Sequence, residues 1–351
     1  MSVTRSWPGA VEVSVNVDGE GEVRGLAYVG LVGNPEAGDR VVLNTSALSL
    51  GLGTGGYAHV VAIPDRLPAD PPPGPGHLVK ARYTPLQATV LGVDEQDSRW
   101  HDTLRDADEL DGMPVIVADL HSALPAILAG LRISAPQARV AYVMTDGGAL
   151  PVWFSRTVAT LREAGWIAGA VTVGQAFGGD LEAVTLHTGL LAARLVLTAD
   201  VAIVTQGPGN LGTGTRWGFS GVACGEAVNA AMVLGGRPVG SLRISDADPR
   251  PRHHGVSHHS LTAYGKVALA SADIAVPELP GEFGDKVRTQ AARLGGRHRL
   301  ASVSLDGLDA ALRTTPATLS TMGRSLDEDH AYFLAAGAAG KHAAGLLRHD
   351  G

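Results

Sequence analysis

The sequence predicts an α/β protein in which a small N-terminal β-barrel or β-sandwich precedes a doubly wound, mostly parallel sheet. Three observations support this prediction. Residues 11–17 alternate apolar and polar side chains, and glycines repeatedly interrupt the segment that contains them. From about residue 114, continuous apolar runs alternate with helical patterns. A glycine-rich stretch leads from one apolar run into a helix. We therefore expect a β-rich domain over residues 1–95 and an α/β domain with C-terminal helices over residues 96–351.

The N-terminal domain is predicted from short apolar strands with no helical stretch between them. These strands are expected at residues 11–17, 40–43, 59–63 and 88–93. A series of short strands joined by tight turns is typical of a small barrel or sandwich. The prolines at positions 71–73 interrupt the series, either as an exposed loop or as an extended spacer.

The C-terminal domain is predicted from a repeated order of strand, turn and helix. Strands are expected at residues 114–118, 140–144, 167–173, 201–205, 238–244, 274–276 and 300–303. Helices are expected at residues 122–131, 150–164, 187–197, 220–234, 286–294, 308–312 and 329–347. The apolar runs indicate strands that are covered on both faces, as in a parallel sheet. The loops at the carboxyl ends of such strands carry function, and the pattern is Rossmann-like.

Composition excludes several classes of protein. Of 351 residues, 45% are hydrophobic and 18% charged, which is typical of a compact fold. The formal charge of −7, without a basic stripe, argues against a nucleic-acid partner. No apolar stretch is long enough for a membrane span or a signal peptide, and the single cysteine cannot form an intramolecular disulfide. We expect a cytoplasmic protein that forms a homodimer.

The first candidate site is the glycine loop, residues 206–221. Glycines allow main-chain N–H groups to approach an anion, and the helix that follows adds a favourable dipole. The candidate ligand-binding residues are Gly209, Asn210, Gly212, Thr213, Gly214, Thr215 and Arg216. The loop is neither a Walker loop nor a regular dinucleotide motif, because the helix begins only near Ser220. The alternative is that the loop is only a long connection between a strand and a helix, in which glycines are needed because the backbone adopts positive φ angles.

The second candidate is the histidine loop, residues 250–260, which contains four of the 13 histidines. His254 and His258 are the expected acid and base, together with Asp146, and Arg252 is expected to bind anionic oxygens. The alternative is a set of solvated histidines that cap a helix or line a subunit contact.

Acidic residues that follow predicted strands suggest a divalent metal. Asp119 and His121 follow the strand at 114–118, and with His259 they form the candidate ligand set. Asp146 follows the strand at 140–144. Helix capping and turn formation are the alternative roles of both aspartates.

Two nucleophile types give weaker signals. Neither Ser155 nor Ser220 stands in a Gly-x-Ser-x-Gly elbow. Cys224 lies near a helix N-terminus, which can activate a thiol, but a small buried hydrophobe is the commoner role in such an apolar pattern.

Three segments resemble a bacterial family, common in actinobacteria, that is catalogued as a domain of unknown function, number 3866. They are residues 52–57, 212–221 and 253–260. The resemblance implies no reaction, and therefore no catalytic residue can be transferred from it.

Three functions remain open from the sequence. The leading hypothesis is a protein that binds or transforms a small anionic, phosphorylated metabolite, with a nucleotide or a divalent metal as possible cofactor. The second is a metal-dependent hydrolase that uses Asp119, His121, Asp146 and His258. The third is a non-catalytic scaffold or regulatory protein that docks through its N-terminal domain. Whether the protein is an enzyme is not decided by the sequence.

Overall fold

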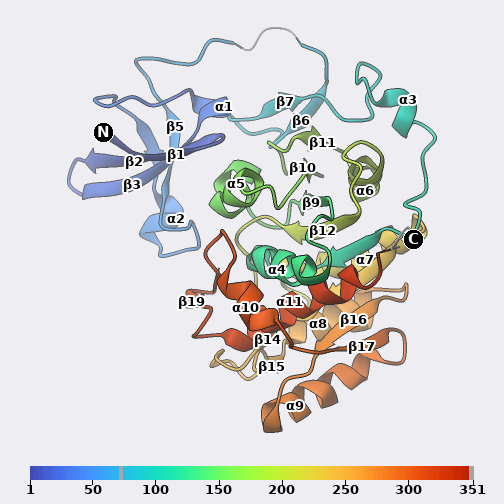
Figure 1. Cartoon of the computed structure of the whole chain (residues 1–351). Helices are drawn as coiled ribbons and strands as arrows, with labels where there is room; N and C mark the ends of the chain where they lie inside the picture. The colour runs from blue at the N-terminus through green and yellow to red at the C-terminus, as the bar shows by residue number, and fades with distance from the viewer. Residues whose placement is uncertain (71–73, 348–351) are drawn as a thin grey trace.

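An eight-stranded parallel sheet forms the centre of the computed structural model, which describes residues 1–70 and 74–347 (Figure 1). In sheet order the strands are β11 (Leu181–Glu182), β10 (Gly169–Thr172), β9 (Val140–Thr145), β12 (Val201–Gln206), β8 (Pro114–Val117), β13 (Arg237–Ser241), β16 (Asp273–Pro277) and β17 (Arg299–Val303). Every neighbouring pair is parallel. The predicted α/β class and parallel sheet are therefore confirmed. The sequence did not predict β11, because two residues are too few to show a period.

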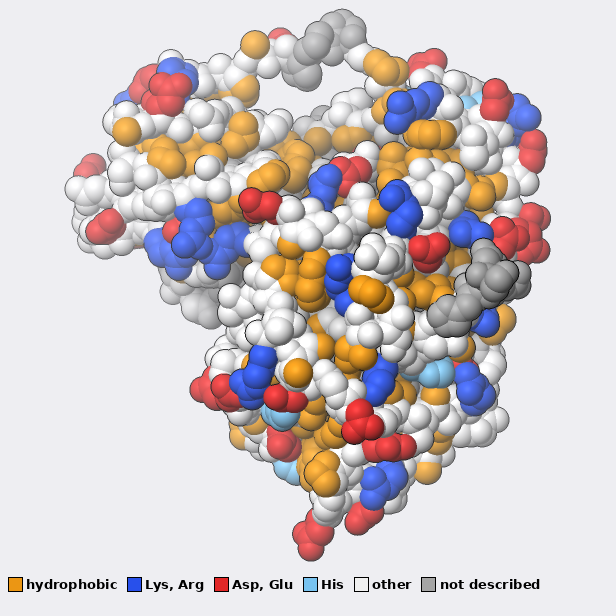
Figure 2. Space-filling view, viewed as in Figure 1, with side chains coloured by type: hydrophobic (Ala, Val, Ile, Leu, Met, Phe, Trp, Pro, Cys, Tyr) orange, Lys and Arg blue, Asp and Glu red, His pale blue; other side chains and the backbone are white. Residues whose placement is uncertain are grey.

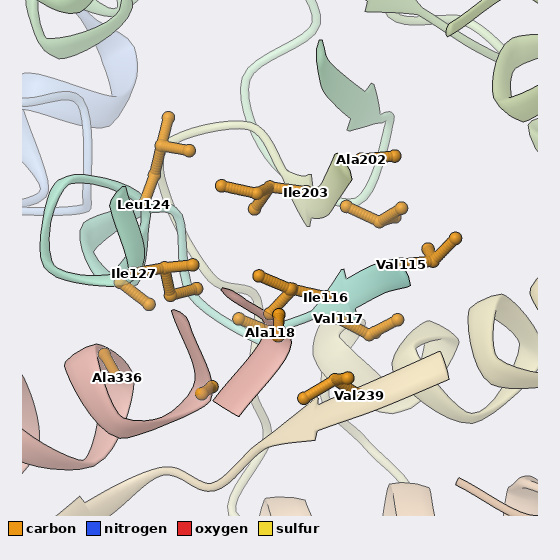
Figure 3. Packing of buried hydrophobic residues seen from close by; sticks show 14 of the residues in the cluster. Val115, Ile116, Val117, Ala118, Leu124, Ile127, Ala202, Ile203, Val239 and Ala336 are labelled. Atoms are coloured by element: carbon orange, nitrogen blue, oxygen red, sulfur yellow. The ribbon is translucent and has the colours of Figure 1, made fainter. Parts of the chain in front are cut away.

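Helices cover both faces of this sheet. Helices α4 (Leu124–Ser134) and α11 (His330–Ala344) pack on one face, and α6 (Leu186–Leu195) and α7 (Ala223–Val233) pack on the other. Figure 3 shows Ile116 of β8 on the side of Leu124, Ile127 and Ala336, with Val115 and Val117 on the opposite side. Because both sides are covered, all four β8 residues are buried, which explains their continuous apolar run.

The strand order brings three loops together. The chain leaves β8 for β9, adds β10 and β11 outward, and returns to form β12 between β9 and β8. It then crosses β8 to form β13 and continues to β16 and β17. The carboxyl ends of β12, β8 and β13 are therefore neighbours, and the chain departs from them in opposite directions. Such a reversal opens a crevice in an open α/β sheet.

The N-terminal segment forms an open sheet. Its order is β1 (Ser2–Trp7), β2 (Ala10–Val17), β3 (Gly21–Tyr28), β5 (Ala58–Ala62) and β4 (Val42–Asn44). All pairs are antiparallel except β3 and β5. The expected barrel is therefore wrong: within the described residues β1 and β4 are unpaired edges. The short helices α1 (Val29–Val32) and α2 (Ser46–Ser49) also differ from the prediction of strands alone.

A second hairpin ties the N-terminal part to the large sheet. Strands β6 (Leu78–Lys80) and β7 (Ala88–Val90) pair only with each other. Lys80 donates hydrogen bonds to the carbonyl oxygens of Gly174, Ala176 and Ala183 over 2.8–3.0 Å. Its Nζ also lies 3.4 Å from Glu182 in β11. The buried ammonium thus fixes the hairpin beside the β10–β11 edge. The prolines 71–73 lie outside the described residues.

The remaining helices are α3 (His101–Leu104), α5 (Arg156–Glu163), α8 (His258–Thr262), α9 (Gly281–Ala291) and α10 (Leu308–Arg313). They pack mainly around these layers: α10 contacts α4 and α11, and α3 contacts α6. The predicted helix at 150–164 is shorter because residues 152–154 form a separate 3₁₀ turn. In the described part of the chain, no helix combines the length and apolar character that a bilayer span requires.

Glycines allow α4 and α11 to pack closely, and this contact can be tested. A Cβ on Gly340 would lie 1.8 Å from the carbonyl oxygen of Ile127. We expect Gly340→Ala to lower the free energy of unfolding by about 1–3 kcal/mol, although alanine alone favours a helix by about 1 kcal/mol. Urea denaturation measures the effect. Gly296→Ala, which adds a methyl group in open space, is the control. An unchanged Gly340→Ala midpoint would contradict the close packing.

Candidate functional site

Two buried charges meet at the carboxyl ends of neighbouring strands. Asp119 follows β8 by two residues, and Arg243 follows β13 by two residues. Their side chains are 9% and 5% exposed, and Arg243 Nη1 lies 3.7 Å from Asp119 Oδ2. This distance makes an ion pair but not a hydrogen bond, and Oδ2 has no hydrogen-bond partner. The pair therefore retains free hydrogen-bonding capacity at the edge of the sheet.

The histidine loop is held against Arg243 by the main chain. The carbonyl oxygen of Arg243 accepts from Ser257 N at 2.8 Å, and Arg243 N donates to Ser260 Oγ at 2.9 Å. Ser257 also begins α8, because its Oγ accepts from His259 N at 3.2 Å. The strand end thus determines where the first residues of α8 lie.

His259 completes the buried group. Its Nδ1 lies 3.2 Å from Arg243 Nη1 and 3.4 Å from Asp119 Oδ2. A guanidinium can only donate, so Nδ1 accepts and a neutral His259 ring carries its proton on Nε2. The ring stacks on Phe219 of the glycine loop, with centroids 3.8 Å apart and planes inclined by 3°. This stack joins the two loops.

The electrostatics of the group favour neutral histidines and an ionised carboxylate. Burial, with Arg243 and Arg250 as further causes, lowers the pKa of His253 to about 3. Burial, His259 and Arg252 lower the pKa of His258 to about 4. Burial alone would raise the pKa of Asp119, but His259 and Arg243 outweigh it and lower the pKa.

Three imidazoles come close enough to share an ion. One ring nitrogen from each of His253, His258 and His259 lies within 4.8 Å of the others. His253 Nδ1 is held by Ser257 Oγ at 2.8 Å, whereas His258 Nε2 is buried without a hydrogen-bond partner. Neutral imidazoles are the form that binds metal ions. This set differs from the predicted metal ligands, because only His259 belongs to both.

The glycine loop is anchored at its base and bonded to itself at its tip. Gln206 Nε2 donates to the carbonyl oxygen of Asp119 at 2.7 Å and to Asn210 Oδ1 at 2.9 Å. At the tip, Thr213 N donates to the carbonyl oxygen of Gly218, and Gly218 N donates to Thr215 Oγ1. Residues 211–217, which include Gly212 and Arg216, are exposed. The loop therefore presents an internally bonded tip to solvent. A 3₁₀ turn begins at Ser220, and helix α7 follows from Ala223, three residues after the predicted start.

The glycine loop also meets an arginine of the histidine loop. A Cβ built on Gly214 would lie 3.7 Å from Arg252 Nη2. Gly209 and Gly214 have φ angles of 93° and 80°, which side chains other than glycine rarely adopt. Gly214 and Arg252 therefore lie close together, on the outer rim where the two loops meet.

Three predicted residues face elsewhere. Asp146 Oδ2 accepts from Gln175 N at 2.8 Å, on the β10 side. His254 Nδ1 lies 2.7 Å from Lys286 Nζ in α9, away from the other imidazoles. His121 bonds to Tyr142 and Ser155 and does not join Asp119 in a ligand set. The spacing of two residues did not place Asp119 and His121 on one side, because a 3₁₀ turn begins at His121.

The crevice between the strand ends is narrow. Asp119, Thr145, Gln206 and Cys224 line a volume of about 10 Å³, enough for about one water molecule. Cys224 is buried, and burial raises the pKa of its thiol well above the ordinary value, which agrees with the role of a small hydrophobe. A larger ligand must therefore lie on the outer rim of the loops.

The sequence hypotheses missed two residues of this group. Arg243 follows an apolar strand directly, and this position was the available signal. Phe219 carried no signal, because its contact with His259 joins segments 40 residues apart in the chain.

His121 gives a pH-dependent prediction. Burial lowers its pKa from 6.5 to about 4. Between these pH values the unfolded chain binds a proton that the folded chain does not, so the free energy of unfolding falls as pH falls, by at most about 3 kcal/mol. We expect His121→Gln to reduce this slope in urea titrations across that range. The exposed His187→Gln is the control, and equal slopes in all three proteins would contradict the burial of a neutral ring.

Comparisons with known proteins give one result. They found no significant match to a curated protein or to a solved structure. The model of one family, described as protein of unknown function (DUF3866), matches residues 24–340. This range includes the large sheet and both loops, and from the N-terminal sheet it includes β4, β5 and most of β3. The chain therefore belongs to the DUF3866 family of proteins of unknown function.

Proposed function

We propose that this protein binds a small anionic metabolite, with a phosphate group as the recognised part, on the rim where the glycine loop meets the histidine loop. The observation that supports this most is the excess of positive charge at the rim. Arg243 pairs with Asp119, and Arg250 pairs with Asp248 at 2.6 Å. Within residues 1–70 and 74–347, Arg252 forms no ion pair. One guanidinium beside Gly214 is thus left for an anion.

The chemistry of the rim suits phosphate oxygens. Arg252 offers a planar set of donors, and the exposed glycine loop offers main-chain N–H groups. Neutral imidazoles of His253 and His258 are available to donate or accept a proton next to the bound group. Asp119, whose buried Oδ2 lacks a partner, would accept from a water molecule in the narrow crevice beneath the rim.

Binding of pyrophosphate tests this proposal. Pyrophosphate at about 100 times its dissociation constant is expected to stabilise the fold by about 2.7 kcal/mol. We expect Arg252→Ala to weaken the affinity at least tenfold in isothermal titration calorimetry, because a charge-assisted bidentate contact is lost. Arg293→Ala, at an exposed position in the 3₁₀ turn that follows α9, is the matched control. The proposal fails if neither pyrophosphate, nucleotides nor sugar phosphates stabilise the protein, or if both variants bind like the wild type.

A second candidate function, a divalent-metal-dependent hydrolase, is favoured by the three imidazoles. The ligand set would be His253, His258 and His259 rather than the one predicted from the sequence. Zinc is bound by imidazole nitrogens at about 2.0–2.1 Å, so the rings would have to move closer together on binding. An open coordination position would then face the anion-binding rim.

Metal content distinguishes this candidate from the first. We expect dialysed protein to bind one equivalent of Zn²⁺ by elemental analysis, and His258→Ala to lose it. His254→Ala is the matched control, since the His254 ring faces Lys286. Equal zinc content in both variants, or none in the wild type, would remove the hydrolase and leave the anion site in place.

A further inference from the structure

A chain of buried hydrogen bonds connects His121 to the end of β12. His121 Nδ1 lies 2.9 Å from Tyr142 Oη, which lies 3.0 Å from Thr205 Oγ1. Thr205 Oγ1 donates to the carbonyl oxygen of Gln206 at 2.8 Å. On the other side of the ring, His121 Nε2 lies 2.7 Å from Ser155 Oγ. None of these side chains takes part in the rim described above.

The carbonyl oxygen at one end sets the direction of every proton. Because it only accepts, Thr205 donates its single proton there at 2.8 Å, and Tyr142 donates to Thr205 at 3.0 Å rather than to the same carbonyl oxygen at 3.5 Å. Tyr142 then accepts from His121 Nδ1, which leaves Nε2 without a proton. Ser155 Oγ therefore donates to Nε2 while it accepts from Val158 N at 3.1 Å. With a neutral His121 ring, this arrangement makes every bond of the chain, and it places a basic nitrogen on a serine hydroxyl.

Ser155 is also the residue that connects this chain to a large cleft. The cleft has a volume of about 1090 Å³ and lies between the start of the N-terminal sheet, α5 and residues 316–320. It is lined by Trp7 and Trp153 as well as by Ser155, Arg5 and Arg156. Figure 2 shows an indentation between the N-terminal lobe and the body, with Lys and Arg side chains gathered on the lobe beside it.

The local backbone offers donors for an oxyanion. Ser155 is the N-cap of α5, and the first main-chain bond of this helix runs from Ala159 N to the carbonyl oxygen of Ser155. The N–H groups of Arg156 and Thr157 therefore precede the first intrahelical bond and are left for other acceptors. Amides at this position stabilise negative charge on an oxygen.

We propose that Ser155 and His121 are the nucleophile and the general base of an ester-hydrolysing site that opens into this cleft. The site does not depend on the anion-binding function proposed above. Its substrate class is a carboxylic ester that carries an anionic group. Arg5 and Arg156 are the cations for that group, since neither forms an ion pair within the described residues.

The reaction balances without a cofactor. Ser155 Oγ attacks the ester carbonyl carbon, and its proton passes to His121 Nε2. The bond from carbon to the alcohol oxygen breaks, and His121 returns the proton to the departing alkoxide. Water then attacks the acyl group on Ser155, gives a proton to Nε2, and releases the acid when that proton returns to Oγ. Burial, which lowers the pKa of His121 to about 4, keeps the resting ring neutral for the first step.

Covalent labelling tests the nucleophile. The full chain is incubated with a fluorophosphonate–biotin probe, and the adduct is mapped by mass spectrometry. We expect the adduct on Ser155, none in Ser155→Ala, and a rate at least ~100-fold lower in His121→Gln. Thr185→Ala is the control for loss of a helix cap, because Thr185 Oγ1 caps α6 in the same way, with Thr188 N as donor, and its labelling should equal that of the wild type.

The positioning role of Tyr142 has its own readout. Tyr142→Phe keeps the buried ring but removes the acceptor for His121 Nδ1, so that labelling slows while the melting temperature of the probe-free protein shows that the fold persists. An adduct absent from Ser155 in the wild type, or equal labelling rates in wild type and His121→Gln, would show that the chain of hydrogen bonds is only structural and overturns the proposal.

Hydrolysis of model esters tests the substrate class. Para-nitrophenyl succinate, which carries a carboxylate, and the neutral para-nitrophenyl acetate are compared. We expect Arg156→Ala to lower kcat/KM for the succinate about tenfold more than for the acetate, because only the succinate loses a charged contact. Equal effects on both esters, or turnover that survives in Ser155→Ala, would contradict the assignment.

Discussion

The buried guanidinium of Arg243 is the constraint on which the candidate rim depends. A charge that leaves water must be compensated by partners, and the guanidinium has its partners in two chain segments: Asp119 after β8 and His259 in α8. The geometry is incomplete, since Asp119 lies at ion-pair distance without a hydrogen bond. A buried pair in this state has capacity left for a third group. The unused hydrogen-bonding capacity of the Arg243–Asp119 pair, more than the number of histidines, makes this position suitable for a ligand.

The end of β8 separates two polar networks that differ in their electrostatics. On one side, Asp119 lies among arginines and imidazoles, where charge is concentrated. On the other side, His121 lies among hydroxyl groups of Tyr142, Ser155 and Thr205, where every partner is neutral. Neutral surroundings suit a base that must take and return a proton, whereas charged surroundings suit the capture of an anion. Asp119 and His121, two residues apart in the chain, therefore belong to a charged network and a neutral network, respectively.

The sequence was sufficient for features that depend on local pattern. The parallel sheet and its helices follow from apolar runs such as that of β8, which stay apolar because both faces are covered. The convergence of Gly214 and Arg252 was expected from loops at neighbouring strand ends. The open N-terminal sheet was not predictable in the same way, because alternation shows that Val13 and Val15 face a core but not whether β1 meets β4. Pairing between distant strands depends on long-range contacts that a single sequence does not display.

The candidate residues failed where a turn changed the direction of a side chain. Asp119 and His121 were predicted as a ligand pair because both follow the strand at 114–118, but a 3₁₀ turn begins at His121 and its ring contacts Ser155. Ser155 lacked the glycine elbow that usually marks a nucleophile, and its proximity to His121 arises only through the fold. That a residue follows a strand therefore indicated correctly that it lies at the carboxyl edge of the sheet. It did not indicate which other side chains that residue would contact.

Gln206 links the two networks through one residue. Its side chain holds the carbonyl oxygen of Asp119 and the base of the glycine loop, and its own carbonyl oxygen is the acceptor that orients the protons from Thr205 back to Ser155. A buried side chain with such bonds has few alternative positions, because each displacement would leave a polar group unpaired. Gln206 therefore holds the base of the glycine loop with its side chain, and its main-chain carbonyl oxygen orients the protons that run to His121.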